Sequence, residues 1–100
     1  MELTRILDTL KDADGNLAQG RMRIRNPAFT AADGSEIAGG RKEVVITNGA
    51  VDIQLAPTEG SNPPATYTVE YALQNRGRYT ETWNVPRTGG PYTISQVRGL

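Results

Sequence analysis

Polar and apolar residues alternate with a period of two over several short stretches of this chain, which is the pattern of a half-buried β-strand. The clearest stretch is Arg21–Arg25, where Met22 and Ile24 are predicted to face a core while the arginines face solvent. Val51–Leu55 alternates in the same way, and Lys42–Thr47 is rich in β-branched residues. No segment keeps a helical period of 3.6 residues for three turns, so we expect a chain without a helix.

Two hairpins are predicted from the turn residues between these stretches. Asn48-Gly49 is a strong hairpin signal, because both residues tolerate the positive φ angles of a type I′ turn. We therefore predict a hairpin from Arg41 to Leu55. A second hairpin is predicted from Thr66–Leu73, the turn Gln74–Gly77 and the returning strand Arg78–Val85.

Further turns and loops separate the remaining elements. Asp12–Asn16 is rich in aspartate, glycine and asparagine, which favours a tight turn. Phe29 is predicted to plug the loop in which it lies. Ala56–Ala65 contains three prolines and is predicted to be a long loop. Tyr92–Val97 is predicted to form a last short strand.

About seven short strands separated by such turns predict an all-β fold, a single β-sandwich of about seven strands. The pattern does not fix the order of strands in the sheets, so Ig-like, fibronectin-like and transthyretin-like topologies stay open. At 100 residues the chain has the ordinary size of one domain, and we expect a single domain over residues 1–100.

Composition argues against several classes of function. The chain has no cysteine and no histidine, so it lacks the usual general base near neutral pH and the commonest transition-metal ligands. We therefore expect no enzyme and no cofactor or metal. Lys plus Arg equals Asp plus Glu at 11 each, which argues against nucleic acid as a partner. No apolar run approaches the ~20 residues of a membrane-spanning helix, so we expect no membrane association.

Several short motifs carry a resemblance to known β-sandwich families. Leu55-Ala56-Pro57, followed after a loop by Thr66–Tyr71, resembles the L-x-P…Y-x-V-x-V passage of fibronectin type III and related Ig-like domains, whose tyrosine packs at a sandwich corner. A broader set resembles small Ig-like modules of tailed-phage virion and tail-associated proteins: Asp12–Gly20, Gly49–Pro57, Tyr67–Val69 and Trp83–Pro86. The resemblance implies an Ig-like or fibronectin-like sandwich that serves in assembly, adhesion or as a spacer.

Five residues are candidates for contact with a partner. Arg21, Arg23 and Arg25 project from one face of a strand about 7 Å apart, a spacing that suits acidic side chains or phosphates. Alternatively, they solvate an exposed sheet face, pair with acids on a neighbouring strand, or keep an edge strand from pairing with another chain. Asn62 lies in the long loop, and Tyr92, after a glycine-rich turn, is the aromatic residue that we expect at the surface.

Other polar and aromatic groups receive a structural interpretation. Asp12, Asp14 and Asn16 form part of a calcium-loop pattern but lack its remaining ligands, so we predict a β-turn. The aromatic residues of the second hairpin are predicted to form a core cluster rather than a carbohydrate platform: Tyr67, Tyr71, Tyr79 and Trp83. The carboxylates available for acid–base chemistry are Glu43, Asp52, Glu70 and Glu81, and several of them occupy positions that are predicted to face outward.

We therefore expect a non-enzymatic structural or interaction module. The resemblance points to a tail-associated component of a tailed-phage virion that acts in assembly or attachment. A capsid decoration protein and an extracellular or cell-surface carbohydrate-binding or adhesion domain are the alternatives, and a small enzyme is the least favoured. The expected partners are other virion or surface proteins, a second copy of the chain, or a glycan.

Overall fold

Residues 3–74, 78–87 and 90–98 are described by the computed structural model of the chain. Across these residues it forms eight β-strands and one four-residue helix, α1 (Ile94–Val97). The strands are β1 (Thr4–Thr9), β2 (Gly20–Asn26), β3 (Phe29–Thr30), β4 (Glu36–Ile37), β5 (Gly40–Ile46), β6 (Ala50–Leu55), β7 (Tyr67–Leu73) and β8 (Arg78–Trp83). The prediction of an all-β fold is confirmed.

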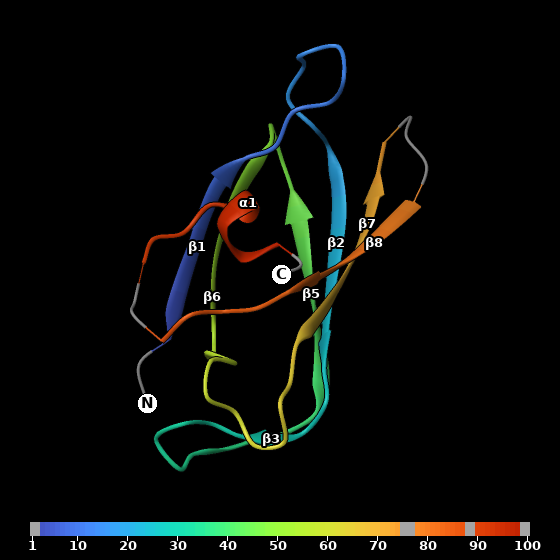
Figure 1. Cartoon of the computed structure of the whole chain (residues 1–100). Helices are drawn as coiled ribbons and strands as arrows, with labels where there is room; N and C mark the ends of the chain where they lie inside the picture. The colour runs from blue at the N-terminus through green and yellow to red at the C-terminus, as the bar shows by residue number, and fades with distance from the viewer. Residues whose placement is uncertain (1–2, 75–77, 88–89, 99–100) are drawn as a thin grey trace.

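The longer strands form two antiparallel sheets that face each other (Figure 1). One sheet has four strands in the order β5-β2-β7-β8, and the other pairs β1 with β6. Tyr92 continues the second sheet beside β1: its N–H donates to the Arg5 carbonyl oxygen at 3.0 Å, and its carbonyl oxygen accepts from the Leu7 N–H at 2.9 Å. The short strands β3 and β4 pair with each other at one end of the molecule.

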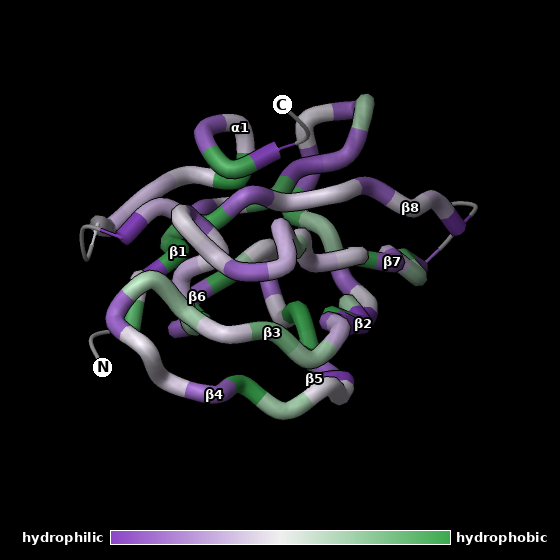
Figure 2. The backbone as a smooth tube through the Cα atoms, turned by 60° about the horizontal axis from the view of Figure 1, so that its bottom comes forward, coloured by the Kyte–Doolittle hydropathy of each residue, from purple (hydrophilic) through white to green (hydrophobic). Residues whose placement is uncertain are grey.

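The main core lies between the two sheets, where hydrophobic segments of both sheets come together (Figure 2), and alternate residues of β2 and β6 are buried in it. Met22 and Ile24 of β2 are buried as predicted, and Trp83 of β8 is fully buried. Phe29 is buried in a smaller cluster of its own, which confirms that it plugs its loop.

The chain passes from one sheet to the other at Asn48-Gly49. The turn forms as predicted, with φ angles of 53° at Asn48 and 74° at Gly49. The strands beside it do not pair as the predicted hairpin from Arg41 to Leu55, because β5 pairs with β2 and β6 pairs with β1. That prediction is wrong because the apolar residues of β6 can face the core equally well from the opposite sheet.

The second predicted hairpin is confirmed, since β7 pairs with β8. Of its predicted turn, Gln74 is described, and residues 75–77 lie outside the described part of the chain. At the start of β7, the Tyr67 hydroxyl donates to the Ala56 carbonyl oxygen at 2.7 Å. Burial raises the pKa of Tyr67 to about 12.

The predicted last strand, Tyr92–Val97, is wrong beyond its first residue, because α1 occupies its end. Thr93 and Gln96 have the spacing of a capping box, and the Thr93 N–H donates to the Gln96 side-chain oxygen at 2.8 Å. The first N–H of the helix donates to the Asp8 carboxylate at 3.0 Å. These contacts favour a helical turn over a strand.

Within the described residues, no helix is long and apolar enough to cross a membrane.

Candidate functional site

In the four-stranded sheet, alternate side chains point away from the core and form what we call the outer face. Strand pairing arranges these side chains in three rows across the sheet. In the order β5, β2, β7, β8, the first row is Val45, Arg21, Ala72 and Arg78; the middle row is Glu43, Arg23, Glu70 and Thr80; and the third row is Arg41, Arg25, Thr68 and Thr82. Five arginines against two glutamates give it a formal charge of +3, whereas the whole chain has a net charge of zero.

Arg21 and Arg23 pair with glutamates on the two strands that flank β2. Arg21 lies 3.1 Å from Glu43, and Arg23 lies 3.7 Å from Glu43 and 3.9 Å from Glu70, measured from guanidinium nitrogen to carboxylate oxygen. All four side chains remain partly exposed, so each pair contributes less than about 1 kcal/mol. The alternative that these two arginines pair with acids on neighbouring strands is confirmed.

Arg25 occupies a different environment, although it lies on the same strand. Its neighbours across the sheet are Arg41 on β5 and Thr68 on β7. Among the residues that the structure describes, neither Arg25 nor Arg41 lies within ion-pair distance of a carboxylate. Because β2 is an inner strand of its sheet, a role in protecting a sheet edge does not apply to its arginines.

The opposite end of the outer face has a shallow depression of about 430 Å³ between Arg21 and Arg78. Its floor depends on Gly20, where β2 and β7 approach closely. A Cβ atom at Gly20 would lie 2.4 Å from the Ala72 carbonyl oxygen and 2.7 Å from the Leu73 Cα atom. Glycine is therefore required for the strands to pack as they do at this end of the sheet.

The other two predicted contact residues lie away from the outer face. Asn62 is exposed, and its backbone exchanges two hydrogen bonds of 2.9 Å with Thr30 of β3. Tyr92, which we expected at the surface, is instead half-buried beside β1 in the other sheet and packs against the main core, because its backbone pairs with β1. The structure therefore brings the three arginines together but does not join Asn62 and Tyr92 to them.

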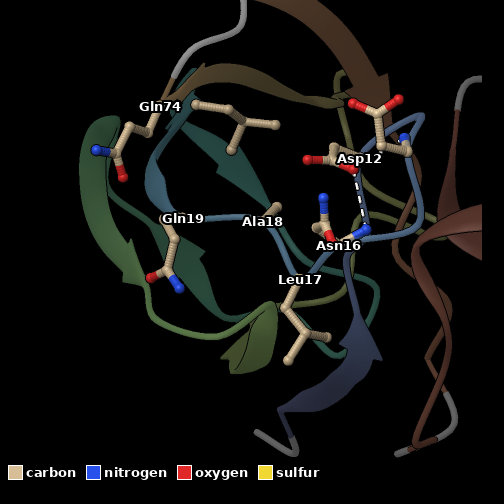
Figure 3. A pocket seen from close by; sticks show the side chains of 8 residues that line it. Asp12, Asn16, Leu17, Ala18, Gln19 and Gln74 are labelled. Atoms are coloured by element: carbon tan, nitrogen blue, oxygen red, sulfur yellow. Dashed lines mark hydrogen bonds between the residues drawn. The ribbon is translucent and has the colours of Figure 1, made fainter.

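The segment with the calcium-loop pattern is folded as a turn. The Asp12 carboxylate accepts hydrogen bonds from the backbone N–H groups of Asp14 and Asn16 at 2.9 and 3.0 Å. This turn borders a depression of about 290 Å³, which is also lined by Gln19, just before β2, and by Gln74, just after β7 (Figure 3). No three acidic residues of the described chain gather into a metal-binding group.

Glu81 is a partly buried carboxylate on the core side of β8, opposite Val69. Its side chain is 13% exposed. The Tyr71 hydroxyl and the Trp83 indole N–H donate to its Oε1 atom at 2.5 and 3.0 Å, and the Arg98 Nε donates to its Oε2 atom at 2.5 Å. Burial raises the pKa of Glu81, but these hydrogen bonds outweigh it, and the pKa lies below its ordinary value.

The aromatic residues of the second hairpin are core residues with one exception. Tyr67, Tyr71 and Trp83 are buried as predicted, whereas Tyr79 is 42% exposed. The Tyr79 ring stacks on Tyr71, with 4.4 Å between ring centroids and 14° between planes. Tyr79 departs from the prediction because β8 is an edge strand, where the core covers a ring from one side only.

Comparisons of the chain with protein-family models, with curated proteins and with solved structures found no match. The resemblance to Ig-like modules of tailed phages therefore stays a prediction from the sequence motifs.

Proposed function

We propose that this chain is a non-catalytic β-sandwich module that binds another protein through the outer face of its four-stranded sheet. The observation that carries the proposal is the concentration of positive charge on this face, +3 on a chain that is neutral as a whole. Aligned strands also give a broad surface on which the charged groups are fixed at regular spacings, which favours recognition of a complementary surface.

The setting of this module follows from the sequence resemblance. It supports a tail-associated virion component that acts in assembly or attachment, with capsid decoration as the alternative within the same class. Either role implies many copies and therefore contact with other virion proteins or with further copies of this chain.

Site-specific photo-crosslinking tests the proposed face. A photoreactive phenylalanine replaces Thr80, which lies in the middle row of the outer face, and in a matched variant it replaces Gln54, which points outward from β6. Both variants are irradiated in an extract of the source organism or virion. We expect a discrete protein adduct from position 80 and none from position 54. Adducts from position 54 alone would contradict the proposal.

Light scattering over a range of concentrations identifies the class of partner. A concentration-dependent oligomer that is lost on Val45→Asp, but kept on Gln54→Asp, would show that the outer face binds a second copy. A monomer at every concentration would assign the adduct to a different protein. An oligomer that is lost only on Gln54→Asp would place the interface on the other sheet and contradict the proposal.

A glycan ligand is the second candidate, and one observation favours it. Tyr79 presents a ring that is 42% exposed and is held in place by stacking on Tyr71. Fixed aromatic faces are suited to stacking on sugar rings. If a glycan array gives a specific signal, Tyr79→Ala should abolish it, while Tyr92→Ala at the other sheet should not.

A further inference from the structure

Two rows of the outer face differ in how charge is arranged around their arginines. In the middle row, Arg23 lies between Glu43 and Glu70, so opposite charges alternate across three strands. In the next row along β2, Arg25 lies opposite Arg41. Like charges directly opposite each other in an antiparallel pair destabilise a sheet, because their Cβ atoms are only about 5 Å apart.

We propose that Arg25 and Arg41 together bind a carboxylate side chain of an acidic protein partner. This inference rests on the proposed function, since it identifies the chemistry of the partner that docks on the outer face. A carboxylate between the two guanidinium groups continues the alternation of charge that the middle row already shows. It also removes the repulsion that the free chain retains.

The chemistry of the two groups favours a carboxylate. Each guanidinium presents a planar set of N–H donors that matches the two oxygens of a carboxylate. The chain already uses this geometry on its other sheet, where Arg5 binds Asp52 through two hydrogen bonds of 2.8 and 2.9 Å. The exposed Arg25 and Arg41 have the same donor sets available for a partner.

The surroundings of the pair give access and an additional polar group. Thr68 lies opposite Arg25 on β7, so its hydroxyl is in the same row. A small depression of about 190 Å³ is lined by Arg23, Arg41, Lys42 and Glu43, so three positive charges border it against one negative charge. Arg41 lies on the edge strand β5, so a partner reaches it both from the outer face and from the side of the sheet.

The same arrangement argues against an extended polyanion such as nucleic acid. A phosphate backbone needs positive charge along its whole path. Glu43 and Glu70 lie one row away from the Arg25–Arg41 pair, and they would repel phosphates that follow the strands. A single acidic side chain meets the two arginines without this repulsion.

NMR titration with hexaglutamate tests the site on the complete chain. The Nε–Hε signals of the arginine side chains are followed in wild type, in R25Q/R41Q and in the control K11Q/R87Q, which removes two positive charges from exposed positions elsewhere. We expect saturable shifts that are largest at Arg25 and Arg41. R25Q/R41Q should weaken binding about tenfold, the loss of roughly one charge-assisted contact, and the control by less than about twofold.

Three results would overturn the inference. One is equal weakening in R25Q/R41Q and the control, which would indicate attraction by net charge alone. Another is tighter binding of tripolyphosphate than of hexaglutamate at the same two residues, which would identify a phosphate site. The third is the absence of saturable shifts at Arg25 and Arg41.

The single substitution Arg41→Glu separates stability from binding. It places a carboxylate opposite Arg25, so it should raise the midpoint of urea unfolding while it abolishes hexaglutamate binding. If the midpoint falls and binding persists, the inference is wrong. Crosslinking at position 80 that is insensitive to R25Q/R41Q would refute this site and leave the proposed function standing. If position 80 gives no adduct in the otherwise wild-type chain but hexaglutamate still binds at Arg25 and Arg41, the proposed function is refuted and this site stands.

Discussion

Replacement of Glu81 by glutamine tests how strongly the hydrogen bonds around this carboxylate stabilise the fold. Glutamine keeps the size of the side chain, but it removes the charge and turns one acceptor oxygen into an amide donor. The glutamine oxygen can replace Oε1, which accepts from both Tyr71 and Trp83, but the amide NH2 then takes the place of Oε2 and faces the Arg98 donor, so that hydrogen bond is lost.

The expected magnitude follows from the geometry. A hydrogen bond to a charged group contributes about 1.5–3 kcal/mol to stability. The Arg98 side chain is 48% exposed, so solvent screens part of its interaction, and we expect a loss of about 2 kcal/mol. In a domain of this size, that loss lowers the melting temperature by about 10 °C and the urea midpoint by about 1 M.

The pH dependence has a definite sign. The folded-state pKa of Glu81 lies below its ordinary value, so its stabilising effect is present above the unfolded-state pKa of about 4.3. This effect is lost as the pH falls through the folded-state pKa. The difference between wild type and Glu81→Gln should therefore be constant above about pH 5 and become smaller toward pH 3.

Urea unfolding at pH 7 and pH 3 measures this difference, and Glu70→Gln is the matched control. Glu70 is on the outer face, 3.9 Å from Arg23, so its substitution should cost less than about 0.5 kcal/mol at either pH. Equal midpoints for Glu81→Gln and Glu70→Gln at pH 7 would refute the reasoning. A Glu81→Gln difference that persists unchanged at pH 3 would show that shape, rather than charge, is the cause.

Three further predictions concern a close contact between strands, a turn and a buried tyrosine. Gly20→Ala should lower the free energy of unfolding by several kcal/mol or prevent folding, because its Cβ would lie 2.4 Å from a carbonyl oxygen of β7. Gly40→Ala is the control: its Cβ meets no atom within 4 Å, so it should change the stability in thermal unfolding by less than about 1 kcal/mol. Asn48→Ala should lower stability by about 1 kcal/mol in urea unfolding, because residue 48 has a φ angle of 53°. Tyr67 should ionise near pH 12 in an ultraviolet titration. The free energy of unfolding should fall above about pH 10, because the phenol ionises at lower pH in the unfolded chain than in the folded chain. Tyr67→Phe should reduce that fall.

Local chemistry explains which features of the fold the sequence predicts. Asn48-Gly49 forms its turn because the positive φ angles are a property of these two residues and need no distant partner. Which strands pair on either side of the turn depends on distant segments, since β5 and β6 bury their apolar residues against the same core from opposite sheets. Periodicity specifies the buried side of a strand but not the sheet to which it belongs.

The helix near the C-terminus had a signal that strand-like composition obscured. Thr93 and Gln96 are spaced as a capping box, but one turn is too short for a helical period to show. Glu81 also carried a signal: it shares the alternation of Tyr79 and Trp83, which places it on the core side of β8. A carboxylate on the core side of a strand needs hydrogen-bond donors, and only the tertiary fold supplies the three that stabilise Glu81 there.

The candidate binding site depends on strand register, which explains why the alternation of β2 could not identify it. Periodicity predicts that Arg21, Arg23 and Arg25 all face outward, and they do. A shift of β5 by two residues would leave the same side chains in the core but place Glu43 opposite Arg25. The native register is supported at the end of β2, where the Asn26 side chain donates to the carbonyl oxygen of Ala38, just before β5, at 3.0 Å. In the native register Glu43 instead lies opposite Arg23 and pairs with Arg21 and Arg23, so the row of Arg25 and Arg41 is left with positive charge only. The retention of Arg25 opposite Arg41 therefore favours a surface whose charge is completed by a partner.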